Sequence, residues 1–481
     1  MNLQSVVAGL GDWSTGQGPL YQRLADSLRN SIRHGVLGAG SRLPSERDLA
    51  RSLGTSRTTI IAAYRLLRDD GLLESTRGSG TRVTASGSGV GPAVPASVMP
   101  FAKLVDEPPE GSIDLTRSVF PSLDGLPDEA LGLTAADIRT LAVNFDYEPL
   151  GLPALRTEIA ARYARLGLPT ATDEVLITTG GQQALNLLFR LFSQDRGTIA
   201  TENPTYAGAL DAARAADATV IGLPSDEEGV TVRSVRDALD RSAVQLMYLM
   251  SACHNPTGAV MSAARRHEVA HLAKAAGTPI IDDETLADLT FDDHARIPFA
   301  ATADTGTVVT VGSLSKLFWA GLRVGWIRAP RQLITRLARL KAVADLGSSH
   351  PGQLLAIRML PRIEEASTAR SLQLIKRRDL LADLLHRQLP TWSWLLPQGG
   401  PFLWVQLPHS DAEAFARLTL RYGVRVLPGS RTSPDKTFAD HLRISFVAEP
   451  AEIETAVARL AEAWALFEST GGTDRTLEIV V

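Results

Sequence analysis

The sequence predicts an α/β protein in two parts, a small basic head with a helix-turn-helix and a large body of alternating strands and helices. In residues 18–84, an apolar stripe at helical spacing precedes two capped helical segments and a glycine-rich hairpin. In residues 112–467, short apolar strands alternate with amphipathic helices, which is the pattern of α/β folds. The 481 residues are too many for one ordinary core, so more than one domain is expected.

The composition is that of an ordinary globular protein, with 44% hydrophobic and 21% charged residues. No stretch holds the roughly 18 uninterrupted apolar residues of a membrane span. The first residues, MNLQSVVAGLGDW, carry neither a basic start nor a cleavage-like site. The single cysteine, Cys253, excludes an internal disulfide, in agreement with a reducing compartment. We therefore expect a cytoplasmic protein without a membrane partner.

The net charge of −4 is unevenly distributed. Residues 18–84 contain eleven arginines, no lysine and six acids, a net charge of +5. Residues 85–481 carry −8. A basic head on an acidic body indicates that the head meets a polyanion.

Three helices are predicted in the head. The first has one apolar stripe, formed by Leu20, Leu24, Leu28 and Ile32. Ser45 is a favourable cap for the second helix, and Gly54 supplies the turn after it. Ser56 is a favourable cap for the third helix, whose exposed N-terminal end is where a recognition helix meets base edges and phosphates. The run LLESTRGSGTRV then predicts a strand, a glycine-rich tip and a strand, the pattern of a wing.

The head resembles the GntR family of bacterial regulators through LPSERDLA, the S-R-T-T start of the third helix, the A-Y-x-x-L register and the G-x-G-T-x-V hairpin. The resemblance implies a winged helix-turn-helix that binds double-stranded operator DNA. The residues expected to meet DNA are Ser45, Arg47, Ser56, Arg57, Thr58, Thr59, Gly78 and Gly80. The alternative is a small helical adaptor whose arginine face is merely solvated.

Residues 85–111 differ in composition from both parts. They contain SGSGVGPAVPASVMP and DEPPEG, and glycine, serine and proline at this density favour a flexible tether over a core element. The alternative is an ordered loop that lies on the body.

The body is organised around residues 307–328, TVVTVGSLSKLFWAGLRVGWIR, which predict a strand, a polar loop and a strand. Lys316 lies in the loop, where a low dielectric favours the neutral amine that forms a Schiff base with an aldehyde. Ser313, Ser315 and Arg323 add donors suited to a phosphate. An aldehyde with a phosphate indicates pyridoxal 5'-phosphate. The alternative is a buried lysine paired with an acid beside a structural arginine.

Other fragments support a site at Lys316. Gly181 opens a helix whose N-terminus can bind an anion, and Tyr206 follows a strand and can stack on a flat ring. Asn255 can donate to a phenolic oxygen, and either Asp282 or Asp283 can hold a pyridinium proton. The body also predicts helices near 371–388 and 450–467 and strands near 402–407 and 441–446.

Over residues 112–467 the body resembles the fold-type I, aspartate-aminotransferase-like enzymes, and head and body together resemble the MocR/GabR subfamily of GntR regulators. The resemblance implies a large and a small domain, a homodimer and pyridoxal 5'-phosphate bound to Lys316. It implies that the cofactor is held by Gly181, Gln182, Tyr206, Asn255, Asp283, Ser313, Ser315, Arg323 and, across the dimer, Tyr147. Arg443, in LRISF, matches the arginine that grips an α-carboxylate.

The sequence departs from that family at Leu286, where a tyrosine is usual. The missing phenol removes a hydrogen bond to the cofactor, which should weaken a transaminase step. It also leaves the choice between Asp283 and Asp282 less certain, and the spacing to Leu289 and Phe291 favours Asp283.

We expect a transcription regulator that senses pyridoxal phosphate, an amino compound or both through an aminotransferase-like body. Residual chemistry is expected in which an amino compound takes the place of Lys316. The main alternative is a working aminotransferase with an appended DNA-binding head, and a distant third is a protein that buffers the cofactor. The complete head and Leu286 favour the regulator.

Overall fold

The computed structural model divides into two compact units, residues 1–107 with 475–481 and residues 108–474. The residues that it describes are 6–7, 10, 13, 19–33, 36–38, 40–70, 72–76, 80–84, 111–120, 128–143, 147–193, 196–292, 296–303, 307–408 and 411–469. The predicted linker, 85–111, lies outside them except for Gly111. No helix in these ranges is both long and apolar enough to cross a membrane.

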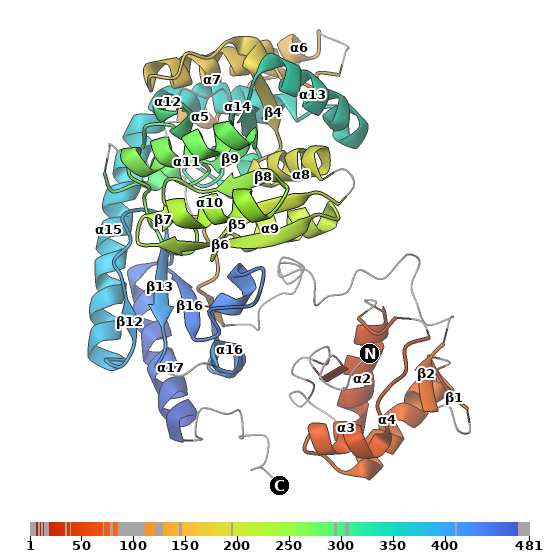
Figure 1. Cartoon of the computed structure of the whole chain (residues 1–481). Coiled ribbons are helices and arrows are strands. Elements are labelled where there is room, and N and C mark those ends of the chain that lie inside the picture. Colours follow the sequence, from red (N-terminus) through yellow and green to blue (C-terminus); the bar gives the residue numbers. More distant parts are fainter. Residues whose placement is uncertain are drawn as a thin grey trace. The chain divides into compact units, whose positions relative to one another are not determined.

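The head is a helix-turn-helix followed by a β-hairpin, as predicted (Figure 1). Its elements are α2 (Leu20–Arg33), α3 (Glu46–Ser52), α4 (Arg57–Asp69), β1 (Leu73–Thr76) and β2 (Gly80–Val83). The predicted stripe of α2 is buried against Ile60, Tyr64 and Leu67 of α4. Val6, Leu10 and Trp13 complete this core, a contribution that the sequence interpretation did not anticipate.

The large domain is built on one eight-stranded sheet, in the order β4-β11-β10-β9-β8-β5-β6-β7. The strands are β4 (Val175–Thr178), β5 (Thr198–Asn203), β6 (Thr219–Asp226), β7 (Gly229–Val230), β8 (Val244–Leu249), β9 (Ile280–Asp283), β10 (Val308–Ser313) and β11 (Gly325–Arg328). Neighbours from β10 to β6 are parallel, whereas β11 and β7 run antiparallel to their neighbours. The segments after β5, β8, β9 and β10 therefore meet at one edge of the sheet.

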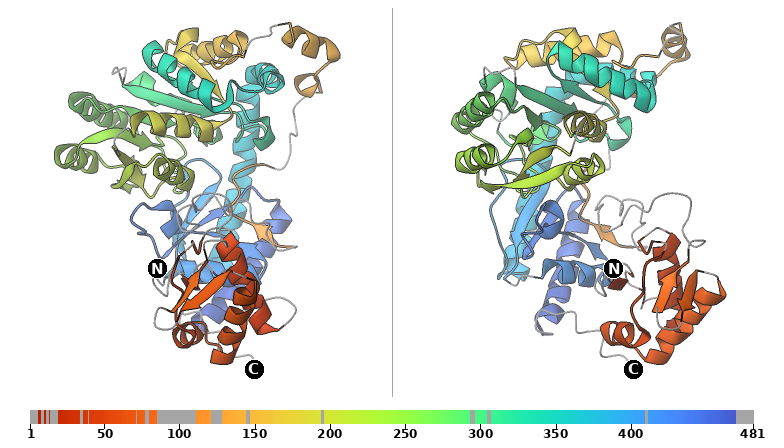
Figure 2. Two further views of the ribbon diagram at one scale, coloured as in Figure 1. Left: turned by 90° about the vertical axis from the view of Figure 1, so that its right-hand side faces the viewer. Right: turned by 45° about the vertical axis from the view of Figure 1, so that its right-hand side comes forward.

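Helices cover both faces of this sheet (Figures 1 and 2). The helices of the large domain are α5 (Asp128–Leu131), α6 (Ala135–Leu141), α7 (Pro153–Arg165), α8 (Gly181–Phe192), α9 (Ala207–Ala215), α10 (Val232–Arg241), α11 (Ala263–Ala276), α12 (Phe299–Thr302), α13 (Arg331–Asp345) and α14 (His350–Met359). Of these, α5 and α6 contact α14 and stand apart from the sheet. Side chains alternate along a strand, so Ile281 packs in the core with α8 while Ile280 packs in a second core with α11 and α12. A sheet buried on both faces explains the apolar runs of β4 and β8.

The small domain has a four-stranded antiparallel sheet and three helices. The sheet order is β12 (Ser393–Trp394), β13 (Phe402–Gln406), β16 (His441–Ser445) and β15 (Leu427–Pro428). The helices are α15 (Ile363–Gln388), α16 (Ala412–Arg421) and α17 (Pro450–Ser469). A separate parallel pair joins β3 (Ile113–Asp114) to β14 (Val424–Arg425).

Helix α15 starts eight residues before the predicted helix. A turn of 3-10 helix that contains Pro361 leads into it, and Glu364 and Glu365 occupy its first turn, where acids favour the helix dipole. The extra two turns make α15 the long helix that runs along both domains of the body in Figure 2.

Candidate functional site

Lys316 lies in the loop after β10, half-buried. Its Nζ donates a hydrogen bond to Ser118 Oγ at 2.6 Å. Burial and the positive charge of Arg443 lower the lysine pKa from 10.5 to about 8, while Asp283 opposes the shift. The lowered pKa increases the fraction of neutral amine near neutral pH, which suits a nucleophile that attacks an aldehyde.

The structure separates the two adjacent aspartates at the end of β9. Asp283 Oδ2 accepts a hydrogen bond from Tyr248 Oη at 2.8 Å, and Oδ1 accepts one from Thr285 N at 3.0 Å. Burial raises the pKa of Asp283, and the charge of Lys316 lowers it. Of the two aspartates, Asp283 is therefore the one that interacts electrostatically with Lys316.

Asp282 has different partners. Its carboxylate accepts hydrogen bonds from the backbone N and the hydroxyl of Ser251, both at 3.1 Å. Burial raises its pKa, and the charge of Arg266 opposes that shift. Neighbouring residues of a strand point to opposite faces, so Asp282 serves the loop after β8 instead of the surroundings of Lys316.

A donor-rich cradle lies between the start of α8 and the loop after β10. Arg323 has a left-handed backbone, with φ of 51°, and its guanidinium donates to Thr179 O. A Cβ on Gly180 would lie 2.9 Å from Arg323 Nη2, so a larger residue would push the guanidinium out of this position. The N-terminus of α8 thus presents its free N–H groups beside a fixed cation, an arrangement that binds anions.

Two serines face the same cradle. Ser313 Oγ donates to Val324 O at 3.2 Å and accepts from Ser315 N at 3.2 Å. The buried Ser315 Oγ has no hydrogen-bond partner among the described residues. A buried hydroxyl without a partner is costly, so this atom calls for an acceptor from a ligand.

Tyr206 and Gln182 are linked to each other. Tyr206 Oη donates to Gln182 Oε1 at 3.1 Å, and Gln182 Nε2 donates to Gly208 O at 2.9 Å. Burial raises the pKa of Tyr206, with the charge of Asp283 as the second cause. The side chain of Gln182 therefore positions Tyr206. The backbone N–H of Gln182 remains available for an anion.

Arg443, on β16, brings a cation of the small domain to this site. Its Nη1 donates to Asn255 Oδ1 at 2.9 Å, and its Nη2 donates to Thr116 O at 2.7 Å. Its guanidinium stacks on the Phe402 ring, with Cζ 4.0 Å from the ring centroid. Its Nε is buried without a partner among the described residues, and burial lowers its pKa to about 10. A buried guanidinium whose hydrogen-bond partners are all neutral is prepared for an anion.

Leu286 is buried at 2% exposure within the large core, and no hydroxyl stands at this position. The sequence interpretation missed Tyr248, although a lone phenol in the apolar run of β8 marks a side chain that needs a buried polar partner. It also missed Thr116 and Ser118, which no motif distinguishes in DLTRSVF. Tyr147 is 73% exposed and lies apart from these contacts.

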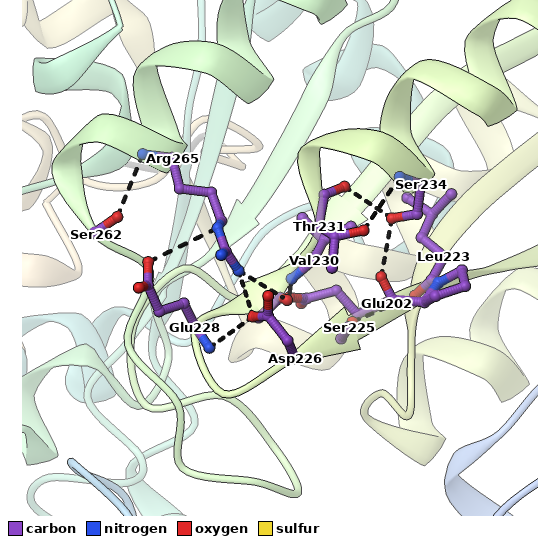
Figure 3. A network of polar contacts seen from close by, with 12 residues as sticks. Glu202, Leu223, Ser225, Asp226, Glu228, Val230, Thr231, Ser234, Ser262 and Arg265 are labelled. Atoms are coloured by element: carbon purple, nitrogen blue, oxygen red, sulfur yellow. Dashed lines mark hydrogen bonds and ion pairs between the residues drawn. The ribbon is translucent and has the colours of Figure 1, made fainter.

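Glu202, on β5, links this strand to β7 and to the residue after β8, within the polar network of Figure 3. Its Oε1 accepts from Val230 N at 3.2 Å and its Oε2 from Met250 N at 2.7 Å. Burial raises the pKa of Glu202 to about 8, against the effect of these two bonds. His254 Nε2 lies 3.5 Å from Glu202 Oε2, and burial lowers the pKa of this histidine to about 4.

In the head, the two cap serines are used as predicted. Ser45 Oγ accepts from Asp48 N at 3.2 Å, and Ser56 Oγ accepts from Thr59 N at 3.1 Å. Arg47, Arg57 and Thr58 are exposed. Neither guanidinium has a hydrogen bond or an ion pair within the described residues, and Gly78 lies outside them.

Residues 113–460 match the family model described as aminotransferase class I and II. Residues 20–83 match the model for bacterial regulatory proteins of the gntR family. The HTH-type transcriptional regulator YisV of Bacillus subtilis, itself described as uncharacterized, is 30% identical over 92% of this chain and 96% of its own length. This chain belongs to the GntR regulators with an aminotransferase class I and II body.

Further relatives agree with this family. The probable rhizopine catabolism regulatory protein MocR of Rhizobium meliloti is 26% identical over 78% of each chain, and the combination of domains is that of the MocR/GabR subfamily. The solved structure of LysN, an alpha-aminoadipate aminotransferase from Thermus thermophilus in complex with N-(5'-phosphopyridoxyl)-L-leucine, is 26% identical. It matches with a TM-score of 0.69 over 75% of this chain and 94% of its own.

The aminotransferase class I and II family depends on pyridoxal phosphate, and the body of this GntR regulator fits that cofactor. The partnerless hydroxyl of Ser315 and the space that Gly180 leaves beside Arg323 suit a phosphate. The lowered pKa of Lys316 suits an aldehyde, and the buried Asp283 suits a ring nitrogen.

Proposed function

We propose that this protein regulates transcription by binding operator DNA through its head and sensing pyridoxal phosphate, an amino compound or both through its body. The observation that carries the proposal is that Lys316 lies near enough to Arg443 for the charge of Arg443 to lower its pKa. Arg443 is a buried cation whose hydrogen-bond partners are all neutral. Because this site is fused to a basic helix-turn-helix head, a bound ligand can change the affinity of the head for DNA.

The cofactor supplies an electrophilic aldehyde and an electron-withdrawing ring when bound. Lys316 provides the amine that attaches to it, and Asp283 holds a proton at the ring nitrogen. Asn255 keeps its amide N–H groups for the ring oxygen, since its Oδ1 is used by Arg443. Gly181, Gln182, Ser313, Ser315 and Arg323 would hold the phosphate, and Tyr206 would pack against the ring.

The effector class follows from Arg443. Its guanidinium offers two N–H groups now used by neutral oxygens, and a carboxylate makes bonds roughly twice as strong to such a donor pair. An amino acid, or a related amino compound with an anionic group, would place its anionic group at Arg443 and its amine at the position of the Lys316 amine.

The DNA surface comprises the exposed N-terminal end of α4 with Arg57 and Thr58, together with Arg47 on α3. Ser45, Ser56 and Thr59 hold these helix ends in shape through their caps. Gly80, with φ of 83°, lies at the start of β2, and with Gly78 it belongs to the proposed wing.

A homodimer is proposed from the surface around Tyr147. A Cβ on Gly347 would lie 2.9 Å from Glu148 O, so the Tyr147 segment runs beside the end of α13. Val343 is 89% exposed and Leu346 47% exposed there, and apolar side chains gathered at a surface favour a protein partner. Tyr147 is then available to the partner's cofactor, and two heads present two half-sites to DNA.

A working aminotransferase is the second candidate, since Lys316 and Asp283 keep the groups that this chemistry requires. The 2-aminoadipate transaminase of Thermus thermophilus is 29% identical over 79% of this chain. Leu286 argues against efficient turnover because it cannot bond to the cofactor ring. A coupled assay across the common amino acids discriminates the two, since fast multiple turnover favours the enzyme.

The experiment that tests the regulator is a footprint on the DNA upstream of its own gene and of the divergent unit beside it. The wild type should protect two half-sites. The double variant Arg47→Ala and Arg57→Ala should lose protection while keeping its cofactor. Equal footprints for both proteins would contradict the assignment.

A further inference from the structure

The first described residues of the body, 111–120, form a segment that we call the strap. Its beginning is fixed to the backbone of the small domain. Ile113 N donates to Gly423 O at 2.8 Å, and Leu115 N donates to Arg425 O at 2.9 Å. Ser445 N donates to Leu115 O at 2.8 Å, so the strap is also held next to β16.

Beyond Leu115 the strap crosses between the two cations of the site. Thr116 O accepts from Arg443 Nη2 at 2.7 Å, and Ser118 Oγ accepts from Lys316 Nζ at 2.6 Å. Arg443 belongs to the small domain and Lys316 to the large domain, so one short segment contacts the reactive groups of both.

The orientation of the Thr116 carbonyl depends on Asp114. Asp114 Oδ1 accepts from Thr116 N at 2.9 Å and from Thr116 Oγ1 at 2.6 Å, which closes a tight turn. Arg117 adds an ion pair with Asp114 at 3.3 Å, and its side chain is 60% exposed. The partly buried hydrogen bonds, not the exposed ion pair, hold the turn.

We propose that Thr116 and Ser118 form part of the effector site. Attachment of pyridoxal phosphate to Lys316 releases Ser118, and an amino acid then binds by displacing Thr116 from Arg443. This deepens the proposed function and rests on it in one respect, that a single ligand addresses both cations. A carboxylate outcompetes the carbonyl of Thr116 because its bonds to a guanidinium are charge-assisted and bidentate. The partnerless Nε of Arg443 offers it a further donor.

Displacement of the strap can affect the head through the predicted linker. In sequence, the strap continues from residues 85–111, the predicted linker, without an intervening element. Binding therefore breaks contacts in the segment through which the body is joined to the linker. A ligand shifts an equilibrium only through contacts that differ between the two states. Here these contacts are that of Ser118 for pyridoxal phosphate and that of Thr116 for the amino acid.

The test uses the full chain loaded with pyridoxal phosphate and L-alanine as the probe, followed through the cofactor absorption. Asp114→Ala opens the turn, whereas Asp114→Asn removes the charge but keeps an oxygen acceptor for Thr116. Arg117→Ala is the matched control on the same turn. The half-saturating L-alanine concentration should fall roughly three- to tenfold in Asp114→Ala and stay near wild type in the other two.

Hydrogen exchange of the strap amides gives a second readout, which does not depend on the folding of Asp114→Ala. Exchange should increase when pyridoxal phosphate is added and again with L-alanine. Ser118→Ala should raise the exchange of the cofactor-free protein to the level of the loaded wild type.

Three results overturn the proposal. These are L-alanine binding without increased strap exchange, equal effects of the two Asp114 variants, and no spectral response to L-alanine at all, since any amino acid carries both required groups. DNA binding plays no part in these measurements, so their failure leaves the footprint test of the regulator independent.

Discussion

At the scale of residues, the site depends on burying groups whose charged or unpaired forms are costly. Lys316, Asp283 and Arg443 all have pKa values shifted chiefly by burial, each toward its neutral form. The opposite charges of Lys316 and Asp283 offset part of that cost for each other, whereas the charge of Arg443 adds to the cost for Lys316. Such residues are retained for a ligand more than for stability, because an unpaired buried charge destabilises a fold.

Lys316→Ala should abolish covalent attachment of the cofactor and the borohydride-sensitive absorption band that it produces. Weaker binding through Arg323 and Ser315 should remain. In the wild type, the rate of attachment should rise with pH and level off above about 8, where the amine is neutral. Stopped-flow absorbance checks both points, and an unchanged spectrum in Lys316→Ala would rule this lysine out.

Glu202 provides a prediction about stability. Its folded-state pKa of about 8 lies above the ordinary 4.5, so its contribution is present at low pH and is lost as pH rises through 8. His254 acts oppositely, since its pKa is lowered to about 4 and its contribution is lost as pH falls from 6.5 toward that value. Between pH 6.5 and 8, Glu202 therefore causes most of the change in unfolding free energy that comes from these two residues.

Glu202→Gln should therefore flatten the decline in unfolding free energy between pH 6.5 and 8, measured by urea denaturation. The control is Glu228→Gln, which changes an exposed carboxylate in the same network (Figure 3). A decline in Glu202→Gln equal to that of the wild type would refute the role given to this acid.

At the scale of elements, the carboxyl edge of the parallel strands and the N-terminus of α8 assemble the site. Gly180→Ala tests this geometry because its Cβ would meet Arg323 and its φ of 93° is strained for alanine. We expect a loss of about 1 to 3 kcal/mol in stability, and at least roughly tenfold weaker cofactor binding.

Gly277→Ala is the matched control for that prediction. Gly277 has φ of 67° at the end of α11, and a Cβ there would meet nothing within 4 Å. Backbone strain alone should lower its melting temperature without changing cofactor affinity. Similar cofactor affinities in the two variants, measured by titration, would remove the argument for a phosphate cradle.

The elements also show how far the sequence could lead. Apolar periodicity and caps predicted the head helices, and the strand-loop-strand pattern placed Lys316 correctly between β10 and β11. The period-two rule alone did not choose between Asp282 and Asp283, because the choice depends on which face meets Tyr248. Thr116 acts through its backbone carbonyl, a contact that side-chain patterns cannot reveal.

At the scale of the whole molecule, the proposed dimer brings two sites and two heads together. Val343→Asp should weaken self-association because it puts a charge at an apolar position that is 89% exposed on the proposed interface. Leu395→Asp, at a position 62% exposed on the small domain, is the control. Sedimentation should give a lighter species for Val343→Asp alone, and equal behaviour of both variants would contradict the assigned surface.

The central claim is that a ligand at Lys316 and Arg443 controls the affinity of the head for DNA. The most direct measurement titrates operator DNA against the wild type and Arg443→Ala, each without cofactor, with pyridoxal phosphate, and with pyridoxal phosphate plus a panel of α- and ω-amino acids. In the wild type, an amino compound should change DNA affinity by roughly five- to a hundredfold. Arg443→Ala should keep its cofactor and basal DNA affinity but lose this response, and a full response in Arg443→Ala would contradict the account.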